Sequence, residues 1–281
     1  MRSFFYGWYF KCQSDIQTLA VIPAIHTAGG KQTCSIQIIT GDGTWTATFP
    51  GNAFCRAGKQ IAIGNNRFGE RGIRLSLHTP ELDAEGCLDF GPLFPLRYDI
   101  MGPFALVPFL ECRHSVWSVQ HAVYGKMRIG QHEYTFRNAR GYWEGDSGRS
   151  FPREYAWTQC SFSGGSLMLS VADIPMMGFH FTGVIGFVLW KGKEYRIATY
   201  LGARAVRIRD GKICIVQGNL ELEVCLLEAA GKPLRAPTNG DMVRTIHESA
   251  ACRAGYRLCR GNQVLFSFQT DKASFEYEYP C

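Results

Sequence analysis

The sequence predicts an all-β protein whose strands are antiparallel and connected up and down, with few short helices. Three observations predict this fold class. Glycine is abundant, with 31 residues, and aromatic residues make up 13% of the chain, whereas long runs of helix-forming residues are missing. Short runs of apolar, aromatic and β-branched residues are separated by turns rich in Gly, Asn and Asp. The connections between these runs are mostly short, as in hairpins, and nothing resembles β-α-β alternation.

Length and charge limit the classes of function. A chain of 281 residues is long enough for one large or two ordinary domains with an ample core. Its net charge of +6, from 30 basic and 24 acidic residues, is spread along the chain. The basic run at residues 204–209 alternates with apolar residues, which indicates one solvated face of a strand. Because no nucleic-acid-binding signature accompanies it, we expect no nucleic-acid partner.

The eleven cysteines predict neither disulfides nor a metal site. None forms a Cys-x-x-Cys pair, and Cys112 and His114 stand two apart without further ligands nearby. There is no nucleotide-binding motif either, so the sequence predicts no cofactor. Because the given sequence starts almost directly with FFYGWYF, we expect no signal peptide. Free thiols without an export signal favour a cytoplasmic location. The longest apolar stretch, residues 176–190, is too short and too interrupted for a membrane-spanning helix.

The strands of the first half follow from apolar runs and alternation. We expect them at residues 4–11, 18–24, 33–39, 45–49, 71–78, 86–94, 115–129 and 132–138. Residues 71–78 alternate most clearly. Gly130 and Gln131 predict a two-residue hairpin turn between the last two strands. The Pro- and Gly-rich passage at residues 90–108 is expected to cross over rather than fold locally.

The second half repeats this pattern. We expect strands at residues 157–162, 166–172, 181–190, 193–200, 203–209, 213–217, 220–227, 251–258, 263–270 and 273–279. A weak internal echo, in which a strand led by Trp8 resembles one led by Trp157, supports two halves. We therefore expect an N-terminal β-barrel over residues 1–140 and a C-terminal β-barrel over residues 141–281.

Residues 141–160 are the most conspicuous stretch. They concentrate three carboxylates with arginines, tyrosines and tryptophans, and their alternation lapses. We expect a loop here, followed by one helical turn at residues 152–155 with Ser150 as its cap. Acids beside aromatic faces are typical of a functional site. The same composition is also typical of a closed barrel end, where Arg149 and Arg153 would simply neutralise Glu144, Asp146 or Glu154.

Three segments together resemble the tocopherol cyclase-like family. They are FYGWYFK at residues 5–11, PFLECRHSVWSVQH at residues 108–121 and GYWEGDSGRSFPREYAWTQ at residues 141–159. The resemblance implies two tandem lipocalin-like β-barrels, and the wider group includes hydratases similar to hydroxyneurosporene synthase. Two residues depart from the family pattern, since Tyr6 stands where the family usually has Glu and Ser147 where it usually has Trp. These departures bear on the prenyl pocket and on activity.

The chemistry that the resemblance implies is the protonation of a trisubstituted alkene to a tertiary cation. It requires a protonated acid, aromatic faces and a dry cavity. We expect Glu144 or Asp146 to be the acid and His114 to assist it. The expected substrate-binding residues are Tyr6, Trp8, Glu111, His121, Tyr142, Trp143, Trp157 and Gln159. The alternatives are that Glu111 and His114 merely pair with each other and that Trp8 and Trp157 are core packing. A spacing of seven places His114 and His121 on opposite faces of a strand unless a bulge intervenes.

The sequence leaves two classes of function open. One is an intramolecular lyase or isomerase that cyclises a prenylated quinol or a similar polyketide- or isoprenoid-like molecule without a cofactor; an isoprenoid double-bond hydratase is related to it. The other is a non-catalytic lipocalin-like carrier that uses the same cavity. In both, the partner is a hydrophobic small molecule. A lipid substrate would require transient contact with a membrane, although the sequence shows no anchor motif.

Overall fold

The computed structural model describes residues 3–108, 110–176, 179–228 and 231–280. The prediction of an all-β fold is confirmed, because the described residues form two antiparallel sheets and only three short 3₁₀ turns, η1 (Gly51–Ala53), η2 (Gly102–Leu106) and η3 (Thr199–Leu201). None of the helical elements in these ranges is long and apolar enough to span a bilayer.

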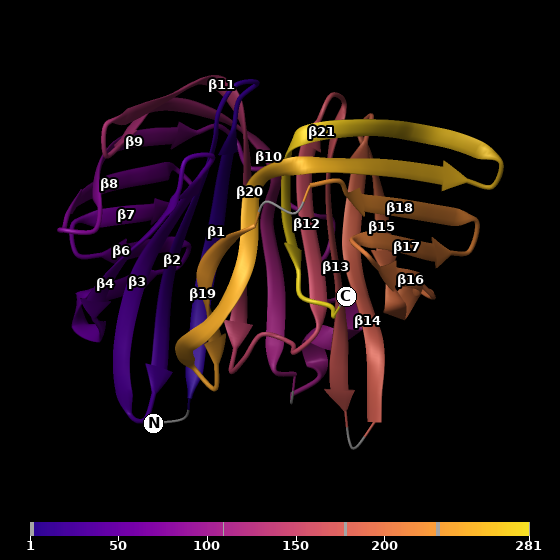
Figure 1. Ribbon diagram of the computed structural model, residues 1–281, viewed down its shortest axis with the longest axis horizontal. Coiled ribbons are helices and arrows are strands. Elements are labelled where there is room, and N and C mark those ends of the chain that lie inside the picture. Colours follow the sequence, from indigo (N-terminus) through magenta and orange to yellow (C-terminus); the bar gives the residue numbers. More distant parts are fainter. Residues whose placement is uncertain (1–2, 109, 177–178, 229–230, 281) are drawn as a thin grey trace. The chain divides into compact units, whose positions relative to one another are not determined.

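The first sheet has eleven strands in the order β4-β3-β2-β1-β11-β10-β9-β8-β7-β6-β5 (Figure 1). Its strands are β1 (Phe4–Gln13), β2 (Thr18–Ala28), β3 (Lys31–Thr40), β4 (Thr44–Pro50), β5 (Phe54–Ala57), β6 (Gln60–Ile63), β7 (Asn66–Gly69), β8 (Gly72–His78), β9 (Asp83–Phe90), β10 (Cys112–Ile129) and β11 (His132–Gly148). In Figure 1, β6 to β9 run across the direction of β1 to β4, and inward residues of both groups of strands belong to one apolar cluster.

The second sheet has ten strands, in the order β15-β14-β13-β12-β21-β20-β18-β17-β16, with β19 paired to β20. Its strands are β12 (Tyr155–Phe162), β13 (Gly165–Met176), β14 (Phe179–Trp190), β15 (Lys193–Ala198), β16 (Arg204–Arg209), β17 (Lys212–Gln217), β18 (Leu220–Leu226), β19 (Lys232–Thr238), β20 (Asp241–Arg260) and β21 (Gln263–Tyr277). Its order repeats that of the first sheet, with β12 in the place of β1 and β21 in the place of β11. No described residues pair the two end strands of either sheet, so both sheets stay open.

The chain divides into two compact units that each include a segment from the other half of the sequence. Unit 1 comprises Met1–Arg97, Leu110–Phe151 and Arg235–Arg244, and unit 2 comprises Tyr98–Phe109, Pro152–Leu234 and Thr245–Cys281. Within unit 1, Arg235 is held by Gln37, whose amide donates to the Arg235 carbonyl at 3.3 Å and accepts from its N–H at 3.2 Å. Within unit 2, Arg196 donates to the carbonyls of Tyr98 and Asp99 at 2.9 and 3.0 Å. The division of the chain after residue 140 stays a prediction.

Alternation decides which side chains form the core of unit 1. Trp8, Phe10 and Cys12 on β1, and Trp143 on β11, belong to one apolar cluster with the inward residues of the other strands. Because successive side chains of a strand point to opposite faces, their neighbours point away from this core. Unit 2 has its own cluster, which includes Ala156, Cys160 and Phe162 of β12. Burial of such apolar surface is the main stabilising term in each unit.

The structure corrects the expectation for residues 141–160. Residues 141–148 are not a loop but the second half of β11, paired with β1 on one side and β10 on the other. Residues 152–155 form no helical turn, since 153 and 154 are bends and β12 begins at Tyr155. The predicted turn at Gly130 is confirmed: Ile129 pairs with His132, and Gly130 adopts a φ of 57°, which glycine tolerates at no steric cost.

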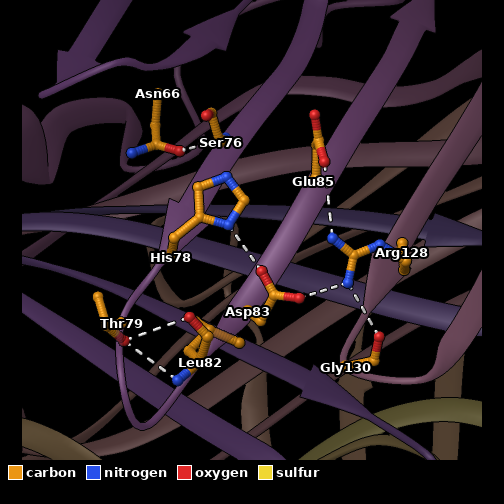
Figure 2. A network of polar contacts seen from close by, with 9 residues as sticks. All are labelled: Asn66, Ser76, His78, Thr79, Leu82, Asp83, Glu85, Arg128 and Gly130. Carbon is orange, nitrogen blue, oxygen red and sulfur yellow. Dashed lines mark hydrogen bonds and ion pairs between the residues drawn. The ribbon is translucent and has the colours of Figure 1, made fainter.

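A polar network on the surface of unit 1 joins β8, β9 and β10 (Figure 2). The Nδ1 of His78 lies 2.7 Å from Asp83 Oδ1, and the Arg128 guanidinium contacts Asp83 and Glu85. The His78 side chain is 59% exposed. Exposed ion pairs contribute little to stability, because water solvates their separated charges almost as well. The contact between His78 and Asp83 is therefore an exposed histidine–carboxylate pair, with which buried pairs of the same kind can be compared.

Candidate functional site: a buried histidine between two carboxylates

Three of the expected site residues project from one face of β11. Tyr142, Glu144 and Asp146 are two residues apart from each other, so their side chains point the same way. His114 of β10 lies directly opposite Asp146 in the antiparallel ladder, and Val116 lies opposite Glu144. Cross-strand neighbours on one face have Cβ atoms about 5 Å apart. The register of β10 and β11 thus places the His114 ring among the three side chains.

Both ring nitrogens of His114 contact a carboxylate. Nε2 lies 2.9 Å from Glu144 Oε2, and Nδ1 lies 2.8 Å from Asp146 Oδ1. The Tyr142 hydroxyl donates a further hydrogen bond to Glu144 Oε2. A neutral imidazole has only one N–H, so two such contacts to carboxylates identify His114 as an imidazolium that donates from both nitrogens.

Electrostatics support this protonation state. Burial by itself lowers the pKa of His114, but the charges and hydrogen bonds of Glu144 and Asp146 outweigh it and raise the pKa well above its usual value. Burial, reinforced by the Glu144 carboxylate, raises the pKa of Tyr142 well above its usual range, so this residue stays a phenol that can donate. With two carboxylates and one imidazolium, the cluster carries one net negative charge when both acids are ionised.

Asp146 is the most accessible member of the cluster. Its side chain is 26% exposed, compared with 7% for His114 and 4% for Glu144. The thiol of Cys112 also approaches Asp146 Oδ1, at 3.6 Å, so both donors converge on the same oxygen. Oδ1 of Asp146 is thus held in place by His114 and Cys112.

The cluster points away from the apolar core of unit 1. Trp143 belongs to that core, so its neighbours Tyr142 and Glu144 project from the opposite face. His121 projects into the core face, because it pairs with Gly141, which lies two residues before Trp143. As expected from their spacing, His114 and His121 thus lie on opposite faces. Two one-residue register shifts occur between them and add up to two residues, which leaves the alternation of the two faces unchanged.

The other expected substrate-binding residues of unit 1 are distributed over its interior. Tyr6 stacks on Trp8 with ring centroids 4.2 Å apart, and Arg56 lies over both rings. Trp143 stacks on Phe10 with centroids 5.0 Å apart. Trp8 and Trp143 are therefore core residues of unit 1 and do not face the carboxylates.

Two expected site residues belong to unit 2. Trp157 and Gln159 lie on β12, and both point away from the apolar cluster that contains Ala156 and Cys160. Gln159 is fully buried, and its amide lies 3.3 Å from Ser161 Oγ. Their role in binding a substrate stays a prediction.

The alternative in which Glu111 pairs with His114 is not found. The carbonyl of Glu111 accepts the backbone N–H of Arg149 at 2.8 Å, whereas the two ring nitrogens of His114 contact Glu144 and Asp146. A role of Arg149 and Arg153 in neutralising these carboxylates stays a prediction. Sequence reasoning missed Cys112, although its spacing of two from His114 on a strand would have placed both side chains on one face.

The described residues contain no group of three or more His, Cys, Asp and Glu side chains arranged to hold a metal ion. All ten cysteines that the structure describes are free thiols.

Comparisons with known proteins identify the fold. No protein-family model matches the sequence, and no curated protein matches it. Solved structures do match. CghA, solved with Sch210972, has a TM-score of 0.58 and 9% identity, covering 98% of this chain and 88% of its own. Kievitone hydratase from Nectria haematococca has a TM-score of 0.57 and 7% identity, covering 98% of this chain and 89% of its own. At such low identity the likeness shows the fold alone: this chain has the lipocalin-like architecture that these neighbours share.

Proposed function

We propose that this protein is a tocopherol cyclase-like enzyme that starts an intramolecular cyclisation, or a related isomerisation, by protonating an alkene of a prenylated quinol or a similar hydrophobic substrate. The observation that carries this proposal is the His114 imidazolium held between two carboxylates, one of which is partly accessible. Burial and paired acids are the means by which proteins prepare a group for proton transfer. The family resemblance of the sequence points to the same reaction.

Asp146 is the proton donor in this proposal. In its protonated form it carries the proton on Oδ2, while Oδ1 accepts from His114 and Cys112. Those two contacts strengthen when the proton leaves, because they then stabilise a full carboxylate. A donor whose conjugate base is stabilised in advance lowers the barrier to protonating a weakly basic alkene.

Glu144 and His114 support the acid without contacting the alkene. Glu144 is held in place by hydrogen bonds from the Tyr142 hydroxyl and from His114. Its charge keeps His114 protonated, and His114 in turn orients Asp146. Once the proton has left Asp146, the cluster carries one net negative charge. In a partly buried site this charge attracts the carbocation formed nearby.

The reaction balances without an oxidant or a reductant. The Oδ2–H bond of Asp146 breaks, the alkene π electrons form a new C–H bond, and the positive charge develops on the more substituted carbon. The substrate's phenol oxygen attacks that carbon to form a C–O bond, and its proton returns to Asp146. The acid is thereby regenerated, and the product is an isomer of the substrate.

A hydratase is a second candidate, favoured by the structural neighbour kievitone hydratase. It would use the same acid, with water instead of the phenol oxygen capturing the cation. A carrier is the third candidate, and the complex of CghA with Sch210972 is compatible with a hydrophobic ligand in this fold. We propose a cytoplasmic location, because the ten described cysteines are free thiols, which are typical of a reducing compartment.

The test is turnover of a panel of prenylated hydroquinones by wild type, Asp146→Asn and Glu144→Gln. Asp89→Asn is a matched control, because Asp89 is an exposed aspartate whose partner is Arg74. We expect cyclised product from wild type and the control, and a loss of about 100-fold or more in Asp146→Asn, as for removal of a general acid. Full activity in Asp146→Asn would refute the assignment of the acid. A hydrated product would favour the hydratase, and a ligand that binds but never reacts would favour the carrier.

A further inference from the structure

A glycine of β1 lies directly opposite Asp146. Gly7 is the cross-strand partner of Asp146 in the β1–β11 pair, and the next residue, Trp8, belongs to the apolar core. Gly7 therefore shares the face of Asp146, because residues directly opposite each other in a ladder point to the same side of the sheet. On the other flank of Asp146, in β10, stands His114. One flank of this carboxylate thus holds an imidazolium, and the other has no side chain.

The space over Gly7 is open. Apart from its chain neighbours, a Cβ atom built on Gly7 would meet one described atom within 4 Å, the Cβ of Ala24 at 3.9 Å. Gly145 of β11 differs, because a Cβ atom there would lie 2.3 Å from the carbonyl oxygen of Gly7. Gly7 and Asp146 are both partly exposed. A methyl group therefore fits beside Asp146 without displacing a described atom.

The fold does not require a glycine at position 7. Glycine inside a strand weakens it and marks a bulge, a tight bend, or the close approach of another backbone or of a ligand. There is no bulge or bend, because β1 keeps one register with β11 from Phe5 to Gln13. Gly7 is not among the described residues with a positive φ, and no described backbone atom beyond its chain neighbours lies within 4 Å of its built Cβ. The remaining reason for a glycine is a ligand.

The surroundings of this space suit an alkene. Phe5 and Tyr9 are the next residues of β1 on the same face, and both are buried. Together with Ala24 on β2, they give the space over Gly7 aromatic and apolar neighbours. Aromatic side chains also stabilise a nearby cation, such as the one that forms when an alkene is protonated. Asp146 thus borders a space in which an uncharged, apolar group is favoured.

We propose, on the basis of the reaction proposed above, that the alkene of the substrate binds over Gly7 and that residue 7 limits the bulk of the group on the alkene carbon that Asp146 protonates. Gly7 is then a specificity-determining residue, which admits the substrate without contributing an atom to the chemistry. A larger side chain at position 7 would occupy the place of the alkene. It would leave the contacts of His114 with Glu144 and Asp146 in place, because these lie between β10 and β11.

The ladder geometry brings such an alkene within reach of the acid. Directly opposite Cβ positions of an antiparallel pair are about 4.5–5.5 Å apart, so a carbon atom at the Cβ position of residue 7 would stand about 5 Å from the Asp146 Cβ. The carboxyl group of Asp146 can bridge this gap to the distance of about 3–3.5 Å at which reacting atoms meet. A methyl group at residue 7 therefore competes directly with a group on the alkene.

The experiment compares two substrates that differ in one methyl group. Prenylhydroquinone carries a hydrogen atom on the alkene carbon that is protonated, and its analogue carries a methyl group there. We measure kcat/KM for both with wild type, Gly7→Ala and Gly7→Val. Gly7→Ala should lower kcat/KM for the analogue relative to prenylhydroquinone by about 10- to 200-fold, as for one methylene too many in a pocket, and Gly7→Val should lower it for both. An unchanged ratio in Gly7→Ala, or full activity of Gly7→Val, would overturn the proposal.

Gly255→Ala and Gly255→Val are the matched controls. Gly255 lies inside β20 in unit 2, and a Cβ atom built on it would have its nearest contact at 3.8 Å, to the Gln269 side chain. Both control variants should keep the wild-type ratio. Urea unfolding should show no loss of stability for Gly7→Val, because a β-branched residue suits a strand where space is open. A large loss would contradict the open space over Gly7.

Methylation of Asp146 tests the approach over Gly7 without any turnover. Trimethyloxonium is a small reagent that methylates carboxylates, and mass spectrometry of peptides locates the methyl ester. Gly7→Val should slow ester formation at Asp146 severalfold, whereas Gly255→Val should not. Unchanged methylation of Asp146 in Gly7→Val would overturn the proposal. A wild type that converts neither substrate would refute the proposed reaction, whereas turnover with an unchanged ratio would refute only the role of Gly7.

Discussion

Replacement of His114 by leucine tests the electrostatic description of the buried cluster. The substitution removes contacts of 2.9 Å to Glu144 and 2.8 Å to Asp146. It leaves Glu144, whose side chain is only 4% exposed, with the Tyr142 hydroxyl as its described donor. Removing one partner of a buried ion pair costs about 3–5 kcal/mol. Because Asp146 is partly exposed and recovers some hydration, we expect a loss at the lower end of that range.

The matched control is His78→Leu. His78 lies at a similar distance, 2.7 Å, from Asp83, but its side chain is 59% exposed. Urea unfolding at pH 7, followed by tryptophan fluorescence, gives the free energy of unfolding for each variant. We expect a large decrease for His114→Leu and no measurable change for His78→Leu. If the two variants lost the same stability, the reasoning that burial makes the His114 contacts strong would be refuted.

The pH dependence gives the sign of the effect. The pKa of His114 in the folded protein lies well above the unfolded value of about 6.5. The stability that His114 contributes is therefore fully present below pH 6.5 and is lost as the pH rises through the folded pKa. The difference in unfolding free energy between wild type and His114→Leu should thus shrink from pH 6 to pH 10. A difference that grows over this range would contradict the assignment of an imidazolium.

Three further predictions concern other parts of the fold. Gly141→Ala places a Cβ 2.2 Å from His121 Nε2, and this overpacking should lower the free energy of unfolding by about 1–3 kcal/mol. Gly7→Ala, whose new Cβ has its nearest contact at 3.9 Å, should fold normally. Urea unfolding checks both variants. Arg196→Met removes the buried partner of Glu194 and should lower the free energy of unfolding, measured in the same way, by about 3 kcal/mol or more. An unchanged free energy of unfolding would show that the Arg196 guanidinium does not hold the chain at Tyr98. Asp83→Asn should leave the melting temperature unchanged, because its ion pairs are exposed (Figure 2).

The strands could be predicted from the sequence because most of them alternate or are short apolar runs between turn residues. Residues 71–78 alternate cleanly and form β8 over Gly72–His78. Hairpins with a glycine turn, such as the one at Gly130, could be predicted equally well. The short strands β5 to β7 were not predicted, because four residues are too few to show the alternation of apolar and polar side chains.

The stretch at residues 141–148 was misread for a physical reason. Its alternation lapses and Pro152 follows it, which suggested a loop. In the structure, glycines 141, 145 and 148 stand where the neighbouring rings of His121 and Trp117, or the backbone at Glu111, leave no room for a side chain. The polar residues of the stretch face away from the core yet are buried, so polarity did not mark a solvent-exposed face. Such close approaches depend on the pairing register, which one sequence does not reveal.

The same limit applies to the candidate site. Composition and the family resemblance together suggested Glu144, Asp146 and His114, but only the register of β10 on β11 shows that the three meet and that Trp143 does not join them. The internal echo indicated two halves, and the two sheets repeat one strand order. It aligned Trp8 with Trp157, however, and these project to different faces relative to their apolar clusters, so the resemblance holds for the strands but not for the two rings.

Turnover in deuterated water tests the central claim most directly. If Asp146 protonates the alkene, its exchangeable proton is replaced by deuterium, and each cyclised product should carry one deuterium at the carbon next to the new C–O-bonded carbon. Mass spectrometry of the product from wild type and from Asp89→Asn should therefore show a gain of one mass unit, with product nearly absent in Asp146→Asn. A cyclised product without deuterium at that carbon would contradict a proton-initiated reaction, and with it the function proposed for this cluster.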